Sequence, residues 1–553
     1  MDRRDHALSR RRVAALLALA LVPLAVLGVF FALPVAGMVS RGLFEGGRFD
    51  PGAMWEVLTR ERTLRVLWFT LWSAAAGTAL SLLLGLPAAY ALHRLEFPGR
   101  RVLRALLLVP FVLPTLVVGV AFRQLFSTSG PLGWLGWDGS VWAILAGLAF
   151  FNTSVVIRAV GSAWESLDRR PGEAAAALGA TPVQVLRTVT LPALRPSIVS
   201  AASVVFLFCA TAFGIVLTLG GLRWSTVETE IYLLTTTLFQ LRAAAVLSLL
   251  QLVVVLVLLV VAQRLRATPD PTVARAVPRP VRPRRTDVPA LAATLVALVL
   301  IGAPILTLVA GSLRVGDGWG LANYRALTST GSNQALTVPV TDALVTSLRT
   351  AVDATWMSLL LGTVIAFVVT RRSVTPGERR LRGALDAVFM LPLGVSAVTV
   401  GFGLLITLDQ PPLDLRDSPL LVPVAQALVA LPLVVRTIVP VLGGVDDRQR
   451  QAAASLGAGA LRTLATVDLP VVWKPMLAAA GFAFAVSLGE FGATAFLARA
   501  DTPTLPVVIY RLIGHPGALN YGMALAASCV LAAATALVML AVERLRVPSV
   551  GAF

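Results

Sequence analysis

The chain has 553 residues, of which 57% are hydrophobic and only 14% are charged. Together with a mean hydropathy of +0.82, this composition excludes an ordinary soluble domain and predicts a chain that buries apolar surface against lipid. The net charge of +18 does not indicate nucleic-acid binding, because the cations lie in short segments beside apolar runs of about 20 residues. We therefore expect an integral membrane protein that binds no nucleic acid.

Twelve apolar runs follow one another along the chain, six in each half of the sequence. They lie near residues 13–39, 66–92, 105–122, 141–157, 198–219, 243–262, 288–310, 351–370, 387–408, 420–435, 476–496 and 521–542. The first run follows an arginine-rich start but is longer than the apolar core of a signal peptide, which is about 7–15 residues. The sequence therefore predicts an all-α membrane protein with twelve transmembrane helices.

The distribution of Lys and Arg indicates the orientation of these spans. With the N-terminus inside, more than twice as many of the 47 Lys and Arg residues lie in inner loops as elsewhere, which agrees with the positive-inside rule. We therefore expect both termini in the cytoplasm. Six spans return the chain to its starting side, so the two six-helix halves are expected to run parallel.

A polar motif follows the fourth span of each half. Its two copies are 278 residues apart, as measured from Glu173 to Gln451. The spacing from the Glu or Gln to a glycine, and from that glycine to a Leu-Pro pair, is the same in both copies, which indicates an internal repeat. The repeated residues are Glu173, Ala174, Ala175, Gly179, Leu191 and Pro192 in the first copy, and Gln451, Ala452, Ala453, Gly457, Leu469 and Pro470 in the second.

The repeat defines the expected domains. A first domain covers residues 1–263 with its loop at 168–196, and a second covers 288–553 with its loop at 446–475. Between them, residues 264–287 are rich in Pro and Arg and predict an extended cytoplasmic tether.

Within the first loop, local signals predict two short helices joined by a glycine. Asp168 can cap the first helix, and Gly179 can adopt the left-handed conformation that ends it. Thr181 and Pro182 are typical of the N-cap and first position of a second helix. The result is an elbow with a small-residue surface, which is suited to a groove on another protein.

The motif of both copies resembles the signature of the permease subunits of binding-protein-dependent ABC importers of the type I class. The first copy matches throughout, with Val189 as the β-branched residue, whereas Gln451 replaces the acidic residue in the second. The resemblance implies the type I importer permease fold in a bacterial plasma membrane, and it implies that each loop docks on one of two ATP-hydrolysing subunits. It also implies that an external binding protein delivers the substrate, and that ATP and Mg bind to the ATPase and no cofactor to this chain.

Two further stretches resemble the ferric iron and thiamine branch of these importers. They are residues 206–214 with 219–221, and residues 487–492. On this resemblance we expect thiamine as the substrate, with ferric iron as the alternative. The stretches contain Phe213 and Phe491, which are candidate pathway residues.

Chemistry on the chain itself is not expected. The only lysine is Lys474, with no glycine-rich loop before it, so ATP hydrolysis through a P-loop is excluded. The three histidines are scattered and predict no metal site. We therefore expect a transport subunit and not an enzyme.

Some polar and helix-breaking residues inside the apolar runs are further pathway candidates. Glu490 is costly at its depth unless it faces protein or water, so it either lines a pathway or makes a structural hydrogen bond. Pro110 and Pro114, with Pro392 and Gly401, mark breaks that either shape the pathway or are packing kinks.

Two other functions are compatible with parts of the sequence. A secondary transporter can also have twelve spans in two parallel halves, but it would be expected to carry its signature loops after spans two and eight instead of four and ten. A membrane-embedded enzyme lacks support, since the sequence shows no paired carboxylates, His cluster or nucleophile motif.

Overall fold

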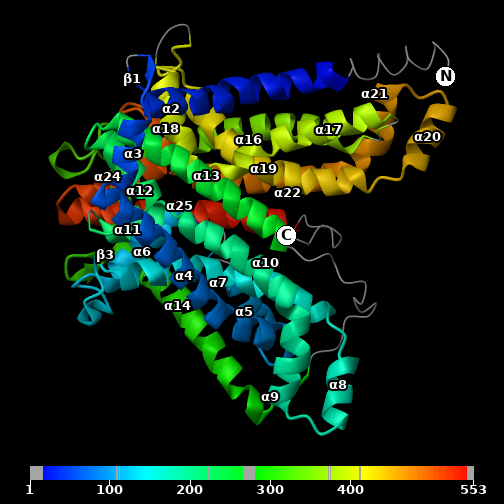
Figure 1. Ribbon diagram of the computed structural model, residues 1–553. Coiled ribbons are helices and arrows are strands. Elements are labelled where there is room, and N and C mark those ends of the chain that lie inside the picture. Colours follow the sequence, from blue (N-terminus) through cyan, green and yellow to red (C-terminus); the bar gives the residue numbers. More distant parts are fainter. Residues whose placement is uncertain are drawn as a thin grey trace. The chain divides into compact units, whose positions relative to one another are not determined.

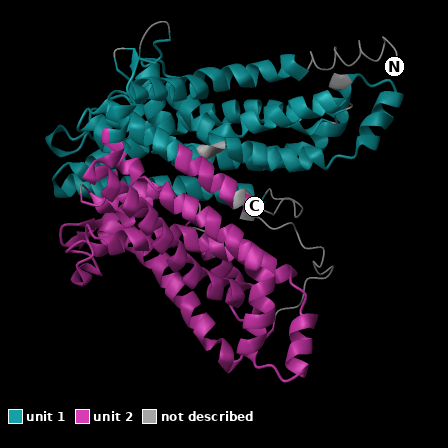
Figure 2. Cartoon of the chain, viewed as in Figure 1, with its two compact units in different colours: residues 1–55, 231–252, 325–553 teal, residues 56–230, 253–324 magenta. Residues whose placement is uncertain are grey.

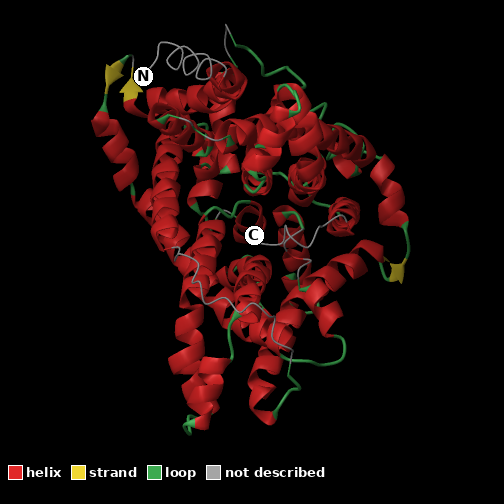
Figure 3. Cartoon of the chain, turned by 90° about the vertical axis from the view of Figure 1, so that its right-hand side faces the viewer, coloured by secondary structure: helices red, strands yellow, loops and turns green. Residues whose placement is uncertain are grey.

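The computed structural model describes residues 16–45, 47–107, 110, 113–221, 223–265, 281–371, 373, 375–409 and 413–544. The described chain is almost entirely helical, with two short hairpins as its strands (Figures 1 and 3). This confirms the all-α fold class.

The elements recur in similar order in the two halves of the chain. The first half contains the π-helix Gly28–Ala32, α2 (Leu33–Leu43), β1 (Phe44–Glu45), β2 (Arg48–Phe49), α3 (Pro51–Thr59), α4 (Glu61–Arg94), α5 (Arg100–Leu106), α6 (Thr115–Phe126), α7 (Val141–Ser166), α8 (Arg170–Ala177), α9 (Pro182–Val185), the π-helix Leu186–Thr190, α10 (Leu191–Ala210), α11 (Gly214–Gly220), α12 (Val227–Thr236) and α13 (Leu241–Leu265). The second half contains α14 (Val288–Leu313), β3 (Arg314–Val315), β4 (Gly318–Trp319), α15 (Ala322–Arg325), α16 (Val340–Thr370), α17 (Pro376–Phe389), α18 (Ala397–Thr407), α19 (Leu421–Gly443), α20 (Asp447–Ser455), α21 (Ala460–Thr463), the π-helix Leu464–Asp468, α22 (Leu469–Leu488), α23 (Thr494–Leu497), α24 (Leu505–Gly514) and α25 (Ala518–Arg544).

Ten helices of the described chain are long and apolar enough to cross a membrane. Three further apolar helices are shorter: α6, α18 and α24. The first two of these occupy the third and ninth predicted spans, so these two spans are shorter than the apolar runs suggested. The other ten predicted spans each overlap one of the long helices.

The third and ninth spans are interrupted where the sequence has prolines. Pro114 stands directly before α6, and Pro392 lies in a short 3-10 turn between α17 and α18. Proline lacks the backbone N–H and disfavours a helical residue before it, so the helix stops at these points. Gly401, in contrast, does not break its helix: it lies inside α18, where its missing side chain allows a close approach to Ala493.

The fifth and eleventh runs are also divided, which the apolar pattern did not predict. The helix α10 ends at Ala210 and α22 at Leu488, and the short helices α11 and α23 follow after a few non-helical residues. The later helices α12 and α24 were not predicted either, because their apolar stretches are too short to be read as spans.

The contacts within the chain define two compact units (Figure 2). One comprises Met1–Trp55, Ile231–Leu252 and Arg325–Phe553, and the other Glu56–Glu230 and Val253–Tyr324. In the first unit α2 packs against α18, and in the second α14 packs against α4 and α6. Each unit thus combines most of one repeat with the first helix of the other. The predicted domain boundaries at residues 263 and 288 follow the sequence repeat. The division of the chain into two domains at these residues remains a prediction.

Part of the predicted tether lies outside the described residues, namely 266–280. The part that follows is attached to the second unit, because Val281 forms a parallel bridge with Leu95. The backbone N–H of Val281 donates to the carbonyl oxygen of Arg94 at 2.9 Å. The hydroxyl of Tyr90 donates to the carboxylate of Asp287 at 2.9 Å, so the end of the tether does not extend freely.

The close contact at Gly401 provides a test of the packing in the first unit. A Cβ atom at this position would lie 2.6 Å from the Cα of Ala493, so Gly401→Ala forces a backbone shift and should destabilise the protein by about 1–3 kcal/mol. Gly302→Ala in α14 is the matched control, because a Cβ atom there meets nothing within 4 Å. Thermal unfolding of the purified variants measures the difference, and equal midpoints would contradict the packing.

Candidate functional site

The first loop is built from α8, a glycine turn and α9. The Asp168 carboxylate accepts a hydrogen bond from the backbone N–H of Arg170 at 3.0 Å, and Pro171 occupies the first turn of α8. The side chain of Glu173 is exposed in that same turn, where a carboxylate is stabilised by the helix dipole. The predicted cap and helix start are therefore present.

Both loops end their first helix with the same hydrogen-bonded turn. Gly179 has φ +91° and Gly457 has φ +80°, a left-handed conformation that L side chains rarely adopt. The N–H of each glycine donates to a carbonyl three residues earlier, and the N–H of the next residue donates to one five residues earlier, at 3.0–3.1 Å in both loops. This is a Schellman motif, and it gives the two copies the same elbow.

The first helix starts alike in both loops, because Asp168 and its repeat partner Asp446 each accept from the backbone N–H two residues later, but the start of the second helix differs. In the first loop, Thr181 and Gln184 form a reciprocal capping box at the start of α9, with the backbone N–H of Thr181 donating to the Gln184 side chain at 2.8 Å. In the second loop, the residue equivalent to Thr181 is Gly459, which has no side chain to cap α21. The elbow itself thus depends on the glycine and not on an identical set of caps.

A leucine directly before each glycine is the most exposed large hydrophobic side chain among the described residues. Leu178 is 90% exposed and Leu456 is 87% exposed. Both lie outside the helices that could cross a membrane, so lipid does not account for their exposure. Sequence analysis missed these residues, although the Leu-Gly pair recurs in both copies. An apolar side chain held on a turn of defined shape is suited to insertion into a partner's pocket.

The predicted loop residues lie in the helices on either side of these elbows. Glu173, Gln451, Ala174 and Ala452 are exposed, whereas Ala175 and Ala453 are half-buried. The exposed face therefore contains only one of the two paired alanines in each copy. The Leu-Pro pairs form the first turns of α10 and α22 and are at least partly exposed, at Leu191, Pro192, Leu469 and Pro470.

Glu490 is buried and uses its carboxylate within the chain. One oxygen accepts from the backbone N–H of Ala493 at 2.7 Å, and the other accepts from that of Thr494 at 3.1 Å. The side chain thereby satisfies two N–H groups at the start of α23. Of the two roles that the sequence left open, this geometry supplies the structural hydrogen bond. In the first repeat the same position is Ala212, so the arrangement is not duplicated.

The aromatic candidates lie in the interior of their units. Phe213 and Phe491 are 6% and 3% exposed. In the first unit the ring of Phe491 lies 5.5 Å from that of Tyr510, and Tyr510 lies 6.2 Å from Tyr232. The two tyrosines are repeat partners from α12 and α24, so this unit brings together two equivalent positions of the repeat. Pro110 and Pro392 are also buried.

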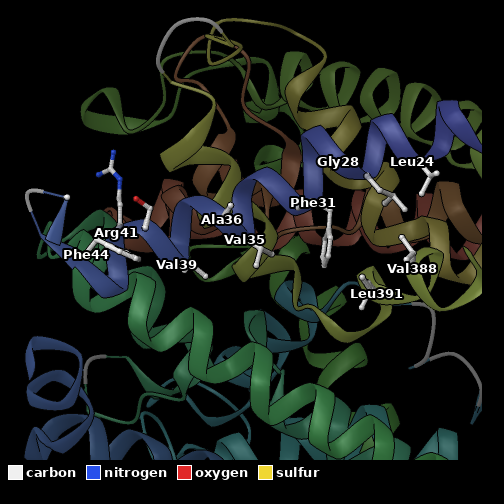
Figure 4. A pocket seen from close by; sticks show the side chains of 14 residues that line it. Leu24, Gly28, Phe31, Val35, Ala36, Val39, Arg41, Phe44, Val388 and Leu391 are labelled. Carbon is white, nitrogen blue, oxygen red and sulfur yellow. The ribbon is translucent and has the colours of Figure 1, made fainter. Parts of the chain in front are cut away.

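An apolar groove of about 970 Å³ lies elsewhere in the first unit (Figure 4). Its lining comes mainly from the first helix, with Phe31 and Val35 facing it, and from Val388 and Leu391. None of the predicted pathway residues contributes to this lining. The groove therefore gives no support to those candidates. Among the described residues there is also no group of three or more His, Cys, Asp or Glu side chains that could hold a metal ion.

Comparison with known proteins gives a consistent result. Residues 81–269 match the family described as "binding-protein-dependent transport system inner membrane component". The chain is 29% identical over 491 residues to the thiamine transport system permease protein ThiP of Brucella abortus, covering 85% of each chain. It is 28% identical over 466 residues to the Escherichia coli protein of the same name, covering 81% of this chain and 83% of that protein. A probable ABC transporter permease protein of Sinorhizobium fredii, y4fN, is 27% identical over 535 residues, or 90% of each chain.

The two hydrogen bonds of Glu490 predict the effect of removing its carboxylate. Glu490→Ala leaves two buried N–H groups without their acceptor and should lower the free energy of unfolding by about 1–3 kcal/mol. Glu61→Ala is the control, because that carboxylate is exposed and pairs only with Arg65 on the helix surface, a contact of about 0–1 kcal/mol. Thermal unfolding measures both, and an unchanged midpoint in Glu490→Ala would refute the capping role. Glu490→Gln with unchanged stability but lost transport would instead indicate a pathway role.

Proposed function

We propose that the chain is a fused, duplicated permease subunit of a binding-protein-dependent ABC importer and that its two loops couple it to ATP-hydrolysing subunits. Permeases of this class work with a separate ATPase and a substrate-binding protein. The observation that supports the loops as the docking surfaces is the pair of elbows, one in each unit, with Leu178 and Leu456 held at the same place on the same turn.

The elbow is suited to transmit movement. Each turn is fixed by its own backbone hydrogen bonds, so a partner that holds the leucine also controls the orientation of the helices on either side of it. The chain then runs through a π-helix directly into α10 or α22, which are long enough to cross a membrane. A displacement of the loop is therefore passed to a membrane-spanning helix without a flexible segment between them.

We further propose two ATPase subunits, one for each loop, because the chain carries two elbows of the same shape. The subunit is a multi-pass protein of the inner membrane, and the positive-inside distribution supports both termini in the cytoplasm. ATP and Mg are assigned to the ATPase, and this chain binds no cofactor. The twelve-span secondary transporter has no support from the family match or from the relatives.

For the substrate we propose thiamine, with ferric iron as the alternative. The support is that several relatives over more than four fifths of the chain are described as thiamine permeases. The contact between Tyr232 and Tyr510 is compatible with a cationic substrate, since aromatic faces attract organic cations. Phe213, Phe491, Glu490, Pro110 and Pro392 remain candidates for the pathway.

The glycine conformation predicts how coupling can be disrupted. At Gly457 a Cβ atom meets nothing within 4 Å, but its positive φ costs an L-residue about 1–2 kcal/mol and a β-branched one more. Gly457→Val should therefore disfavour the elbow about tenfold or more and lower transport, with normal insertion of the chain. Gly459→Val is the matched control in the same loop, because its surroundings are equally open and its φ is not positive.

Uptake by cells and co-isolation of the ATPase with the tagged permease measure this effect. Wild-type transport in a variant with valine at both Gly179 and Gly457 would rule out the proposed role of the elbows. Failure of the wild-type chain to co-isolate with any ATPase would rule out the docking itself.

The substrate can be tested by deleting the gene for this chain. Uptake of labelled thiamine should fall to the background level and be restored by the wild-type gene, while uptake of ferric iron should be unchanged. A parallel measurement of thiamine binding to the partner binding protein gives independent information, because that protein selects the substrate in this class of importer. Unchanged thiamine uptake together with lost iron uptake would assign the protein to ferric iron.

A further inference from the structure

A buried carboxylate lies at the base of the second loop. Asp468 is the last residue before Leu469 and Pro470, and it is fully buried. One of its oxygens accepts from the guanidinium of Arg371 at 2.6 Å, and the other accepts from that of Arg450 at 2.8 Å. We call these three residues the brace.

The brace connects segments that are separate along the chain. Arg371 follows the last residue of α16, Arg450 lies within the loop helix α20, and Asp468 directly precedes α22. Arg450 also donates to the carbonyl oxygen of Leu442 in α19 at 3.1 Å, and its side chain is only 12% exposed. The Arg450 side chain thus attaches the loop helix to α19 and to the start of α22, and the bond between Asp468 and Arg371 adds the end of α16.

The first loop has different residues at the three equivalent positions. With the offset of 278, Arg450 corresponds to Gly172, Asp468 to Thr190 and Arg371 to His93. Gly172 has no side chain and Thr190 has no charge. His93 lies with its Nδ1 3.0 Å from the carboxylate of Glu165 in α7, a contact that does not include the loop helix α8. The brace is therefore a property of the second loop.

We propose that the brace makes the second loop the stiff arm through which ATPase movement reaches α16 and α19 as well as α22, while the first loop acts mainly through α10, into which it continues. This inference rests on the proposed coupling role of the two loops. A displaced α20 must either carry Asp468 with it or separate buried opposite charges, which is strongly unfavourable. The displacement is therefore passed to the helices instead of being absorbed within the loop. Arg371, Arg450 and Asp468 are positioning residues that contact no substrate.

The test compares transport with ATP hydrolysis in the complete importer, reconstituted in vesicles with its ATPase and binding protein. Asp468→Asn and Arg450→Gln should each lower substrate uptake per ATP hydrolysed by about fivefold or more, while the rate of hydrolysis and the amount of complex stay near the wild-type values. Because the two residues act as a unit, the double variant should be no worse than either single variant. Arg450→Lys keeps the charge and should restore part of the uptake.

Two matched controls isolate the brace. Arg448→Gln removes a positive charge from an exposed position of the same helix α20. Thr190→Val changes the position in the first loop that corresponds to Asp468. Neither should alter uptake per ATP.

Hydrogen exchange in the same complex, without nucleotide, measures stiffness directly. The backbone amides of α20 should exchange more slowly than those of α8 in the wild type, and Asp468→Asn should remove this difference. Equal exchange in the wild type, or unchanged uptake per ATP in Asp468→Asn, would overturn the inference. A proportional loss of uptake, hydrolysis and complex would also overturn it, because the brace would then only support folding. If the wild-type complex does not form, the docking proposal fails instead.

Discussion

Within the apolar part of a membrane no water is available to pair with the backbone, so each N–H and C=O group must find its partner inside the protein. This constraint explains why the described chain is almost all helix, and it decides what happens wherever a helix stops. At the start of α23 the Glu490 carboxylate accepts from two backbone N–H groups. Glu490 would be unfavourable in the membrane without hydrogen-bond partners. Here its carboxylate pairs with backbone N–H groups that the break between α22 and α23 would otherwise leave unpaired.

The elbows of the two loops lie outside the helices that could cross a membrane. Water can pair with the backbone there, so the chain can leave the helical conformation and form a turn of defined shape. Gly179 and Gly457 each end a helix with the same set of hydrogen bonds, and each presents a leucine at the tip of the turn. The shape of the proposed docking surface is thus determined within a few residues. It is preserved in both copies although Thr181 caps the second helix of the first loop and Gly459 stands at the equivalent position of the second.

A fused chain allows the two copies to differ, because each half has its own sequence. Glu173 places a carboxylate at the helix start where Gln451 has a neutral amide, so the two proposed docking surfaces are chemically unequal. The attachments of the loops are unequal as well, since Arg450 and Asp468 correspond to Gly172 and Thr190, which carry no charge. The two loops of one chain thus differ both in their exposed surface and in their attachment to the helices, which the loops of two identical subunits could not do.

The sequence by itself determined the features that depend on neighbouring residues. The apolar runs predicted the long helices, the proline positions predicted interruptions, and the residues around Gly179 and Thr181 predicted the elbow with its Thr181 cap. Composition and pattern were sufficient here because these structures are stabilised by contacts within about one helical turn. For the same reason the motif was sufficient to indicate the family.

Only the tertiary structure decided which distant segments meet. It packs α2 against α18 and α14 against α4, it brings Gly401 against the backbone of Ala493, and it pairs Asp468 with an arginine 97 residues away. The structure also shows that Leu178 is exposed, whereas a leucine is expected from its sequence to be buried. These outcomes depend on how well whole surfaces fit one another, and a pattern of neighbouring residues contains no information about the shape of a surface that lies a hundred residues away.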